Sequence, residues 1–224
     1  MKKIIILLVL IVSSCGIEYD GETKIVIKGK VVDSDNNPII NKEVNLFVIK
    51  ESSGFPFIFY SPSEENNIGK ATTNSKGEYI MVIPQPKNNF TEIIVETNSS
   101  NNTHNPKQYR NIKLKDFLNY ELNLPISKLY HKSDLSQLSI TPNNINLNNE
   151  LKNIELLGLV ANELEFINLP ENYYPYYQIN TSVKKNQTII ARYTVLNHST
   201  NITSIVDENI VIDNSNQTNY TLNY

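Results

Sequence analysis

The chain of 224 residues holds no tryptophan, one cysteine, seven glycines and three histidines. A single cysteine excludes an intramolecular disulfide, and so few glycines disfavour glycine-rich phosphate-binding loops. The net charge is -3, from 20 basic and 23 acidic residues. That balance argues against a nucleic-acid partner recognised by phosphate neutralisation. His104, His131 and His198 lie in polar contexts without metal-ligand spacing, and no hydrolase or P-loop motif occurs. We therefore expect no catalytic site, no metal and no cofactor.

What the chain has in abundance is asparagine, 34 residues of it, together with a hydrophobic fraction of 40%. That fraction is enough for a packed core and too high for a disordered chain. Apolar and polar residues alternate in runs of about five to nine residues, with Asn, Ser, Asp, Gly and Pro between the runs. No segment shows a sustained helical period. The pattern predicts an all-β protein of antiparallel strands.

The N-terminal residues have the features of a targeting segment. A short basic start, Met1-Lys2-Lys3, precedes nine apolar residues, Ile4 to Val12. Nine residues are too few to span a bilayer as a helix but suit the apolar region of a signal peptide. The run ends in Val12-Ser13-Ser14-Cys15, which resembles a bacterial lipobox. This resemblance implies cleavage after residues 1–14 and a lipid on Cys15, with the membrane as partner. The alternative is an ordinary secretory signal with an incidental cysteine.

Three acidic residues, Glu18, Asp20 and Glu22, follow the cysteine closely. We interpret residues 15–22 as an acidic tether, for which two explanations stay open. The tether resembles the surface-export signal of Bacteroidota lipoproteins, or it is simply a solvated linker. The expected location is the cell envelope, at the outer membrane and lipid-anchored, with surface exposure if the tether is an export signal.

Residues 23–126 carry the pattern of a first β-sandwich. Ile25, Ile27 and Val31 alternate along one expected strand, and Asp33 to Pro38 has turn chemistry. Spaced segments in this region resemble the carboxypeptidase-regulatory-like domain: Gly29-Lys30-Val31-Val32-Asp33, Pro38-Ile39, Val44-Asn45-Leu46 and Thr72-Thr73-Asn74-Ser75-Lys76-Gly77-Glu78-Tyr79. The resemblance implies a transthyretin-like β-sandwich without catalytic residues. In this scheme Gly29 permits close backbone approach, Gly77 turns the chain and Tyr79 fills the core.

The second half is expected to form a separate sandwich. Residues 127–149, rich in Ser and Asn, read as a linker with one short strand from Gln137 to Ile140. Residues 150–224 then hold five or six apolar runs with Asn-rich turns, including Glu163 to Ile167 and Thr188 to Leu196. We predict a small immunoglobulin-like β-sandwich there.

Four tyrosines surround Pro175, namely Tyr173, Tyr174, Tyr176 and Tyr177. Tyrosine combines apolar area with a hydroxyl, so such a cluster suits contact with a glycan or a surface protein. The other interpretation is a loop whose tyrosines pack in the core. The sequence favours a non-catalytic, membrane-anchored surface lipoprotein that binds or scaffolds. The alternative function is a carbohydrate-binding module that uses these four tyrosines.

Overall fold

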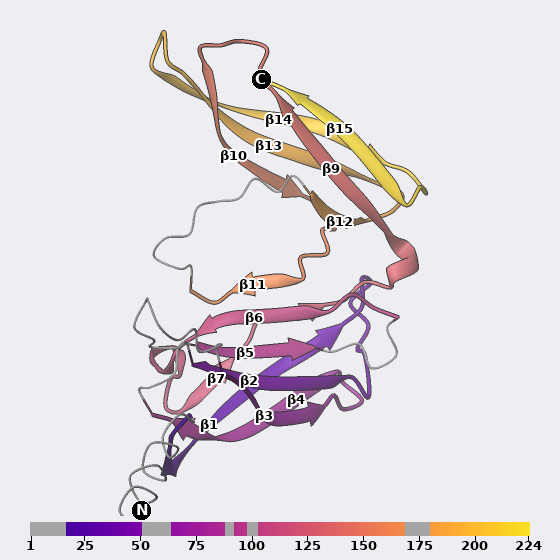
Figure 1. The fold of residues 1–224 in the computed structure, drawn as a ribbon. Coiled ribbons are helices and arrows are strands. Elements are labelled where there is room, and N and C mark those ends of the chain that lie inside the picture. Colours follow the sequence, from indigo (N-terminus) through magenta and orange to yellow (C-terminus); the bar gives the residue numbers. More distant parts are fainter. Residues whose placement is uncertain (1–16, 51–63, 88–91, 98–102, 169–179) are drawn as a thin grey trace, which may run out of the picture.

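The computed structural model describes residues 17–50, 64–87, 92–97, 103–168 and 180–224. These residues form four β-sheets stacked as two sandwiches, joined end to end in Figure 1. No α-helix occurs among them, and the two helical pieces are single 3-10 turns, η1 (Leu114–Asp116) and η2 (Lys132–Asp134). The predicted all-β fold with two sandwiches is confirmed.

The first sandwich contains two sheets. One has the order β4-β1-β7, with β8 also pairing β1. Its strands are β1 (Tyr19–Val32), β4 (Glu78–Pro86), β7 (Glu121–Asn123) and β8 (Ser127–Lys128). The other has the order β11-β6-β5-β2-β3. Its strands are β2 (Glu43–Lys50), β3 (Glu64–Thr72), β5 (Glu92–Thr97), β6 (Lys107–Ile112) and β11 (Leu164–Phe166).

The second sandwich contains two three-stranded sheets, ordered β10-β13-β14 and β12-β9-β15. The strands are β9 (Leu135–Asn143), β10 (Asn149–Leu157), β12 (Asn180–Lys184), β13 (Gln187–Asn197), β14 (Ile202–Ile212) and β15 (Gln217–Asn223). Strand β15 runs parallel to β9, whereas β12 runs antiparallel to it. Strand β15 is therefore an edge strand of its sheet.

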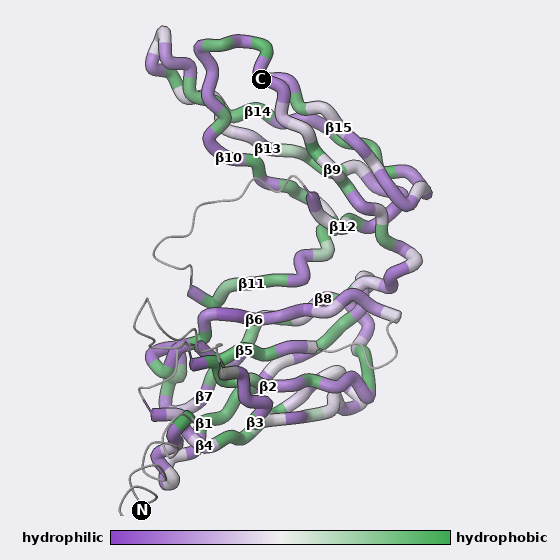
Figure 2. The backbone as a smooth tube through the Cα atoms, in the orientation of Figure 1, coloured by the Kyte–Doolittle hydropathy of each residue, from purple (hydrophilic) through white to green (hydrophobic). Residues whose placement is uncertain are grey.

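Each sandwich has its own apolar core, and Figure 2 shows hydrophobic (green) stretches along the strands of both. The first core comprises Ile17, Ile25, Ile27, Val31, Val44, Leu46, Val48, Tyr79, Met81, Ile83, Ile93, Val95, Tyr109, Ile112, Leu122, Leu124 and Leu129. The second comprises Leu138, Ile140, Leu151, Ile154, Leu156, Val183, Ile189, Ala191, Tyr193, Val195, Ile210, Ile212 and Leu222. Most members alternate along their strands, as the period of two requires.

The residues of the motif that resembles the regulatory-like domain have structural roles in the turn between β3 and β4. The Thr73 hydroxyl donates to the Ile39 carbonyl and accepts from the Lys42 amide. The Asn74 side chain accepts from the amides of residues 76 and 78, which closes the turn. Gly77 has φ +75°, the left-handed conformation expected of it. These motif residues hold the β3–β4 connection against the end of β1.

The reason for glycine at position 29 differs from the expectation. It is opposite Tyr79 in the β1–β4 register, and the Tyr79 ring, not another backbone, fills the space above it. A Cβ on Gly29 would lie 2.3 Å from the Tyr79 hydroxyl. Glycine is therefore required so that the buried aromatic ring can lie across β1.

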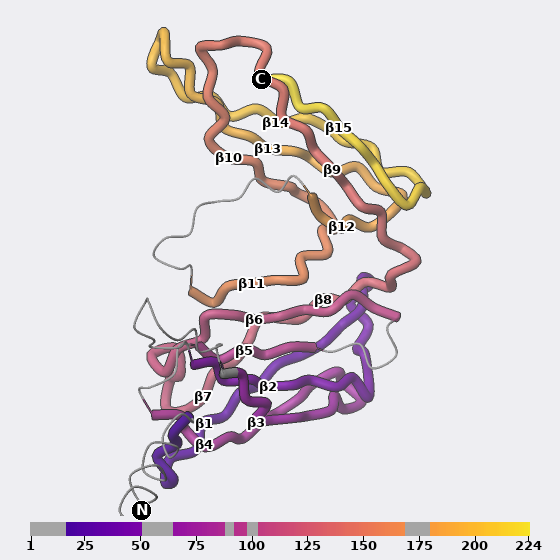
Figure 3. The backbone as a smooth tube through the Cα atoms, viewed as in Figure 1, coloured from indigo at the N-terminus to yellow at the C-terminus, as the bar shows by residue number. Residues whose placement is uncertain are grey.

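Two segments do not follow the domain boundaries that the sequence predicts. Residues 127–149 hold β8, η2 and β9, and β9 is the central strand of its sheet, with Leu138 and Ile140 in the second core. The segment resembles a linker because polar residues dominate it, yet Ser136, Leu138 and Ile140 of β9 are buried. Strand β11 was expected in the second sandwich but pairs in parallel with β6 of the first. Figure 3 shows this orange segment alongside the pink strand β6.

The two sandwiches are joined by this returning strand and by polar contacts. The Lys184 ammonium donates to the Ser34 hydroxyl at 3.0 Å and lies 3.3 Å from the Asp35 carboxylate. The Lys185 amide donates to the Asp134 carbonyl in η2. Asn111 and Asn168 exchange side-chain-to-backbone hydrogen bonds, which fixes the end of β11 on β6. The joint is therefore tied at two separate places.

Candidate functional site

The N-terminal end of the first sandwich follows directly in the chain after the predicted lipid anchor. Ile17 is only 8% exposed and belongs to the first core. The Glu18 carbonyl accepts from the Lys87 amide, and the two side chains form an ion pair at 3.2 Å. Hydrogen bonds from Thr23 and from the Glu22 amide lower the pKa of the Asp20 carboxyl. From Ile17 onward the acidic segment is therefore fixed in the fold, rather than forming the free tether expected at residues 15–22.

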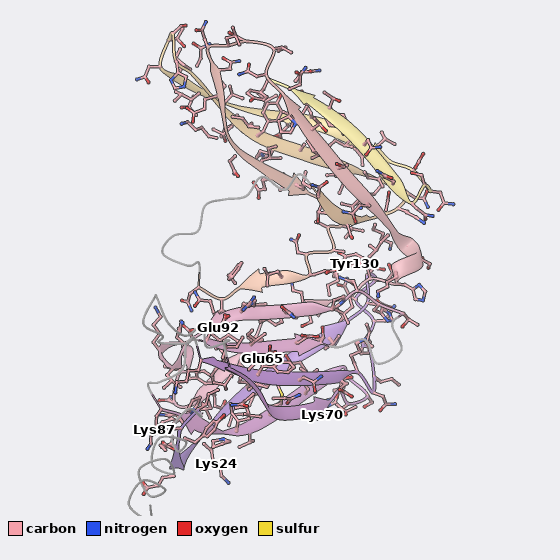
Figure 4. All side chains as sticks on the ribbon, viewed as in Figure 1. Lys24, Glu65, Lys70, Lys87, Glu92 and Tyr130 are labelled. Atoms are coloured by element: carbon pink, nitrogen blue, oxygen red, sulfur yellow. The ribbon has the colours of Figure 1, made fainter. Side chains whose placement is uncertain are left out.

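The predicted lipidation site, Cys15, lies outside the described residues and stays a prediction. In sequence it stands two residues before the buried Ile17. An extended chain spans at most about 3.5 Å per residue, so about 7 Å separates the two Cα atoms at most. Any lipid on Cys15 would hold this end of the sandwich at the bilayer surface. Figure 4 shows Lys24 and Lys87 at the same end.

The four tyrosines of the alternative carbohydrate site, Tyr173, Tyr174, Tyr176 and Tyr177, also lie outside the described residues. The chain around them is described on both sides. The described chain stops at Asn168, just after β11 of the first sandwich, and resumes at Asn180, where β12 of the second begins. Glycan binding there stays a prediction, as does core packing of those side chains.

The structure brings together two histidines that the sequence did not connect. His104 and His131 are opposite each other in an antiparallel bridge, with ring centroids 5.6 Å apart in an edge-to-face arrangement. Burial, then the charge of Lys42 and the neighbouring His131, lower the pKa of His104. The two residues are 27 positions apart, in segments without strand periodicity, so no sequence signal pointed to the pair. Among the described residues no group of three or more His, Cys, Asp or Glu side chains could hold a metal ion.

The Asp33 turn beside this pair is an internal structure of the chain. The Asp33 carboxylate accepts from the amides of Asp35 and Asn37 and from the Asn37 side chain. Partial burial opposes ionisation, but these hydrogen bonds outweigh it and lower the pKa of Asp33. The oxygens are therefore already engaged, as the turn interpretation predicted.

A carboxylate in the second sandwich connects its two sheets. Glu208 on β14 accepts a hydrogen bond from Tyr193 on β13 at 2.8 Å and another from Tyr220 on β15. Burial first, and the Glu208 hydrogen bond second, raise the pKa of Tyr193 to about 12. The Glu208 hydrogen bond is the main cause for Tyr220, whose pKa also rises to about 12. The cluster links β13 and β14 of one sheet to β15 of the other, which is a structural role.

Buried tyrosines make stability depend on alkaline pH. Burial also raises the pKa of Tyr109 to about 12, whereas an unfolded tyrosine ionises near pH 10. Since the folded pKa is raised, the stabilisation is complete below about pH 10 and is lost as pH rises toward 12. Each such tyrosine is expected to contribute a fall of about 1.4 kcal/mol per pH unit in that window.

Urea unfolding between pH 8 and pH 11.5 checks this expectation. The unfolding free energy should be flat to about pH 10 and then fall. The Tyr109→Phe variant, which cannot ionise, should show a shallower fall. A flat profile to pH 11.5 for the wild type would contradict the burial assigned to these phenols.

Two cavities lie on the described part of the first sandwich. One of about 320 Å³ is lined by Lys28, Gly29, Lys30, Glu78, Tyr79, Ile80, Asn123 and Leu124. The other, of about 300 Å³, is lined by Ile25, Gln85, Leu114, Phe117, Asn119 and Tyr120. Neither brings together a nucleophile, a base and an oxyanion donor in the way acyl or phosphoryl transfer needs. No helix in the described part of the chain combines the length and apolarity needed to cross a membrane.

Comparisons with known proteins give structural likenesses only. No protein-family model matches the sequence, and no curated protein matches it. The shaft pilin SpaA of Lactobacillus rhamnosus GG is similar with TM-score 0.36 and 10% identity, over 90% of this chain and 97% of that one. A streptococcal ancillary pilin has TM-score 0.31 and 11% identity, over 90% and 62% of the chains. A proposed adhesin of Bacteroides ovatus has TM-score 0.25 and 9% identity, over 93% of each. At these identities and TM-scores the likenesses carry no argument about function.

Proposed function

We propose that the protein is a non-catalytic lipoprotein of the Bacteroidota type, anchored in the outer membrane by a lipid on Cys15. It acts at the cell surface as a binding or scaffold module. The observation that carries this proposal is the placement of the chain's one cysteine. It follows a basic start, nine apolar residues and two serines, which is the order a lipobox requires.

The folded end of the chain supports the same assignment. Ile17 belongs to the first core, so a buried residue of the sandwich stands only two positions after the proposed lipid attachment at Cys15. Several acyl chains, at about 0.8 kcal/mol per buried methylene, make such an anchor effectively permanent. A rigid sandwich held directly on the membrane is suited to present the second sandwich outward, away from the bilayer.

The first sandwich is proposed to be a carboxypeptidase-regulatory-like module. Gly29, Gly77 and Tyr79 of its motif have structural roles in the β1–β4 pairing and the β3–β4 turn. Thr73 and Asn74 hold that same turn through hydrogen bonds. A motif whose members all serve folding is consistent with a scaffold that contributes no chemistry of its own.

Metabolic labelling with an alkyne analogue of palmitate tests the anchor in the native host. The wild-type chain should incorporate the label and sediment with membranes, and Cys15→Ala should lose both properties. Ser14→Ala is the matched control, because alanine keeps the small residue before the cysteine and labelling should persist. A wild-type chain that stays unlabelled and soluble would overturn the proposal.

A further inference from the structure

The tight turn that leads into β7 has an unusual backbone. Leu118 and Glu121 exchange both backbone hydrogen bonds, at 2.9 and 3.0 Å, so two residues form the loop. Asn119 has φ +50° and Tyr120 has φ +65°. Two consecutive left-handed residues define a type I′ turn, which Asn-Gly sequences favour. This turn has tyrosine where glycine is the least strained residue.

Tyr120 is an exception within the molecule. Seven non-glycine residues in the described part of the chain have positive φ, and the other six are all asparagine. Asparagine tolerates this conformation, whereas a bulky side chain is strained in it. The side chain is also 60% exposed, and the neighbouring Leu118 is 78% exposed. The fold therefore holds two large apolar side chains at an exposed tip, at a cost in backbone strain and without burying them in the core.

The tip lies at the end of the sandwich where the N-terminal segment joins. The Tyr120 carbonyl accepts from the Val26 amide of β1. The cavity of about 300 Å³ behind the tip is lined by Tyr120, Phe117 and Gln85. Gln85 is next to Pro86, which pairs with Tyr19 at the start of β1. Figure 1 shows the start of β1 and the turn before β7 at the same lower-left end.

We propose that Leu118 and Tyr120 insert into the interfacial region of the bilayer and seat the first sandwich on it. This inference rests on the proposed lipid anchor at Cys15. With at most about 7 Å of chain between the anchored residue and Ile17, this end cannot move away from the headgroups. Leucine suits the upper acyl region, and tyrosine suits the headgroup level, where its ring and hydroxyl meet both environments. Lys24 and Lys115 are exposed, and lysines near a membrane surface attract anionic headgroups.

The absence of tryptophan from the chain allows a direct test. Leu118→Trp and Leu147→Trp each introduce a single tryptophan into an exposed turn. Leu147 is 95% exposed in the β9–β10 connection, at the far end of the second sandwich, and is the matched control. Both full-length variants are processed in the native host, purified and reconstituted in phosphatidylethanolamine–phosphatidylglycerol vesicles. Flotation measures anchoring, and quenching by brominated lipids measures depth.

The Leu118→Trp variant is expected to float and to be quenched by brominated lipids, because tryptophan is favoured at the membrane–water interface. The Leu147→Trp variant should float and stay unquenched. If both float and neither is quenched, the anchor stands and the bilayer contact is wrong, which would leave the tip for a protein partner. If neither floats, the proposed anchor is wrong and this inference fails with it.

A second variant separates membrane contact from folding. Tyr120→Gly replaces the strained residue by the one the turn favours. In the Leu118→Trp background, Tyr120→Gly should raise the thermal unfolding midpoint, because the backbone strain is removed. It should also reduce the quenching of the introduced tryptophan's fluorescence by brominated lipids, because one of the two membrane-contacting side chains is lost. A lower midpoint would show that Tyr120 serves the fold. Unchanged quenching would show that the tyrosine does not contact the bilayer.

Discussion

Replacing Gly77 by alanine is expected to destabilise the first sandwich by about 3 kcal/mol. Part of this, about 1 kcal/mol, is the cost of an L-residue in the left-handed conformation. The rest, about 2 kcal/mol, comes from overpacking, because the new Cβ would lie 2.4 Å from the Val31 carbonyl oxygen. That oxygen is backbone, and the Val31 amide donates to the Gly77 carbonyl. The turn and strand β1 would have to separate, and urea unfolding measures the loss.

Gly21 provides the matched control. Its φ of +80° is nearly that of Gly77, but no atom lies within 4 Å of its ideal Cβ position. Gly21→Ala should therefore cost only the conformational part, about 1 kcal/mol. Equal losses in the two variants would show that the close approach of the β3–β4 turn to β1 is wrong.

Removing the Glu165 carboxylate is expected to destabilise the joint between the sandwiches by about 2 kcal/mol. Glu165 on β11 lies 2.7 Å from the ammonium of Lys107 on β6, whose side chain is only 9% exposed. An ion left buried without its partner typically costs about 3–5 kcal/mol. Because the Glu165 side chain is 38% exposed, solvent screening reduces the cost to about 2 kcal/mol. Hydrogen exchange of the Ile167 amide, which donates to the Arg110 carbonyl, should speed up in Glu165→Ala.

The control for this substitution is Glu163→Ala. Glu163 is exposed, and its backbone carbonyl, which any residue retains, accepts from the Gln108 amide. Removing the Glu163 side chain should leave the free energy of unfolding and the exchange rate of the Ile167 amide unchanged. If Glu165→Ala also leaves the Ile167 amide protected, β11 is held on β6 by other contacts, and the ion pair is of no consequence.

Much of the fold could be predicted because the strands follow a period of two. Alternation in Ile25, Ile27 and Val31 was sufficient to indicate a strand, and Gly77 was correctly assigned a positive φ. Strand β11 could not be placed, since three residues carry no period and the sequence does not say which sheet edge is free. The linker interpretation of residues 127–149 failed because β9 mixes polar with apolar residues and buries a serine, Ser136, so its sequence resembles a loop.

The functional residues were less accessible to sequence reasoning. A lipobox is a contiguous signal, so Cys15 could be proposed from sequence alone. The His104–His131 pair could not, since the partners come from loops far apart in the chain. The strain at Tyr120 is a property of φ, and the sequence Leu118-Asn119-Tyr120-Glu121 gives no reason to expect a type I′ turn. The sequence alone thus predicts an attachment point at Cys15, whereas only the backbone identifies the exposed tip at Leu118 and Tyr120.

Intact-mass measurement of the protein purified from native membranes tests the lipid anchor most directly. The anchor predicts a chain that begins at Cys15, lacks residues 1–14 and carries the mass of a diacylglyceryl group with or without a further acyl chain. After alkaline hydrolysis of the esters, the mass should fall by the ester-linked acyl chains. A chain that starts at Met1, or a cleaved chain whose cysteine is free, would contradict it.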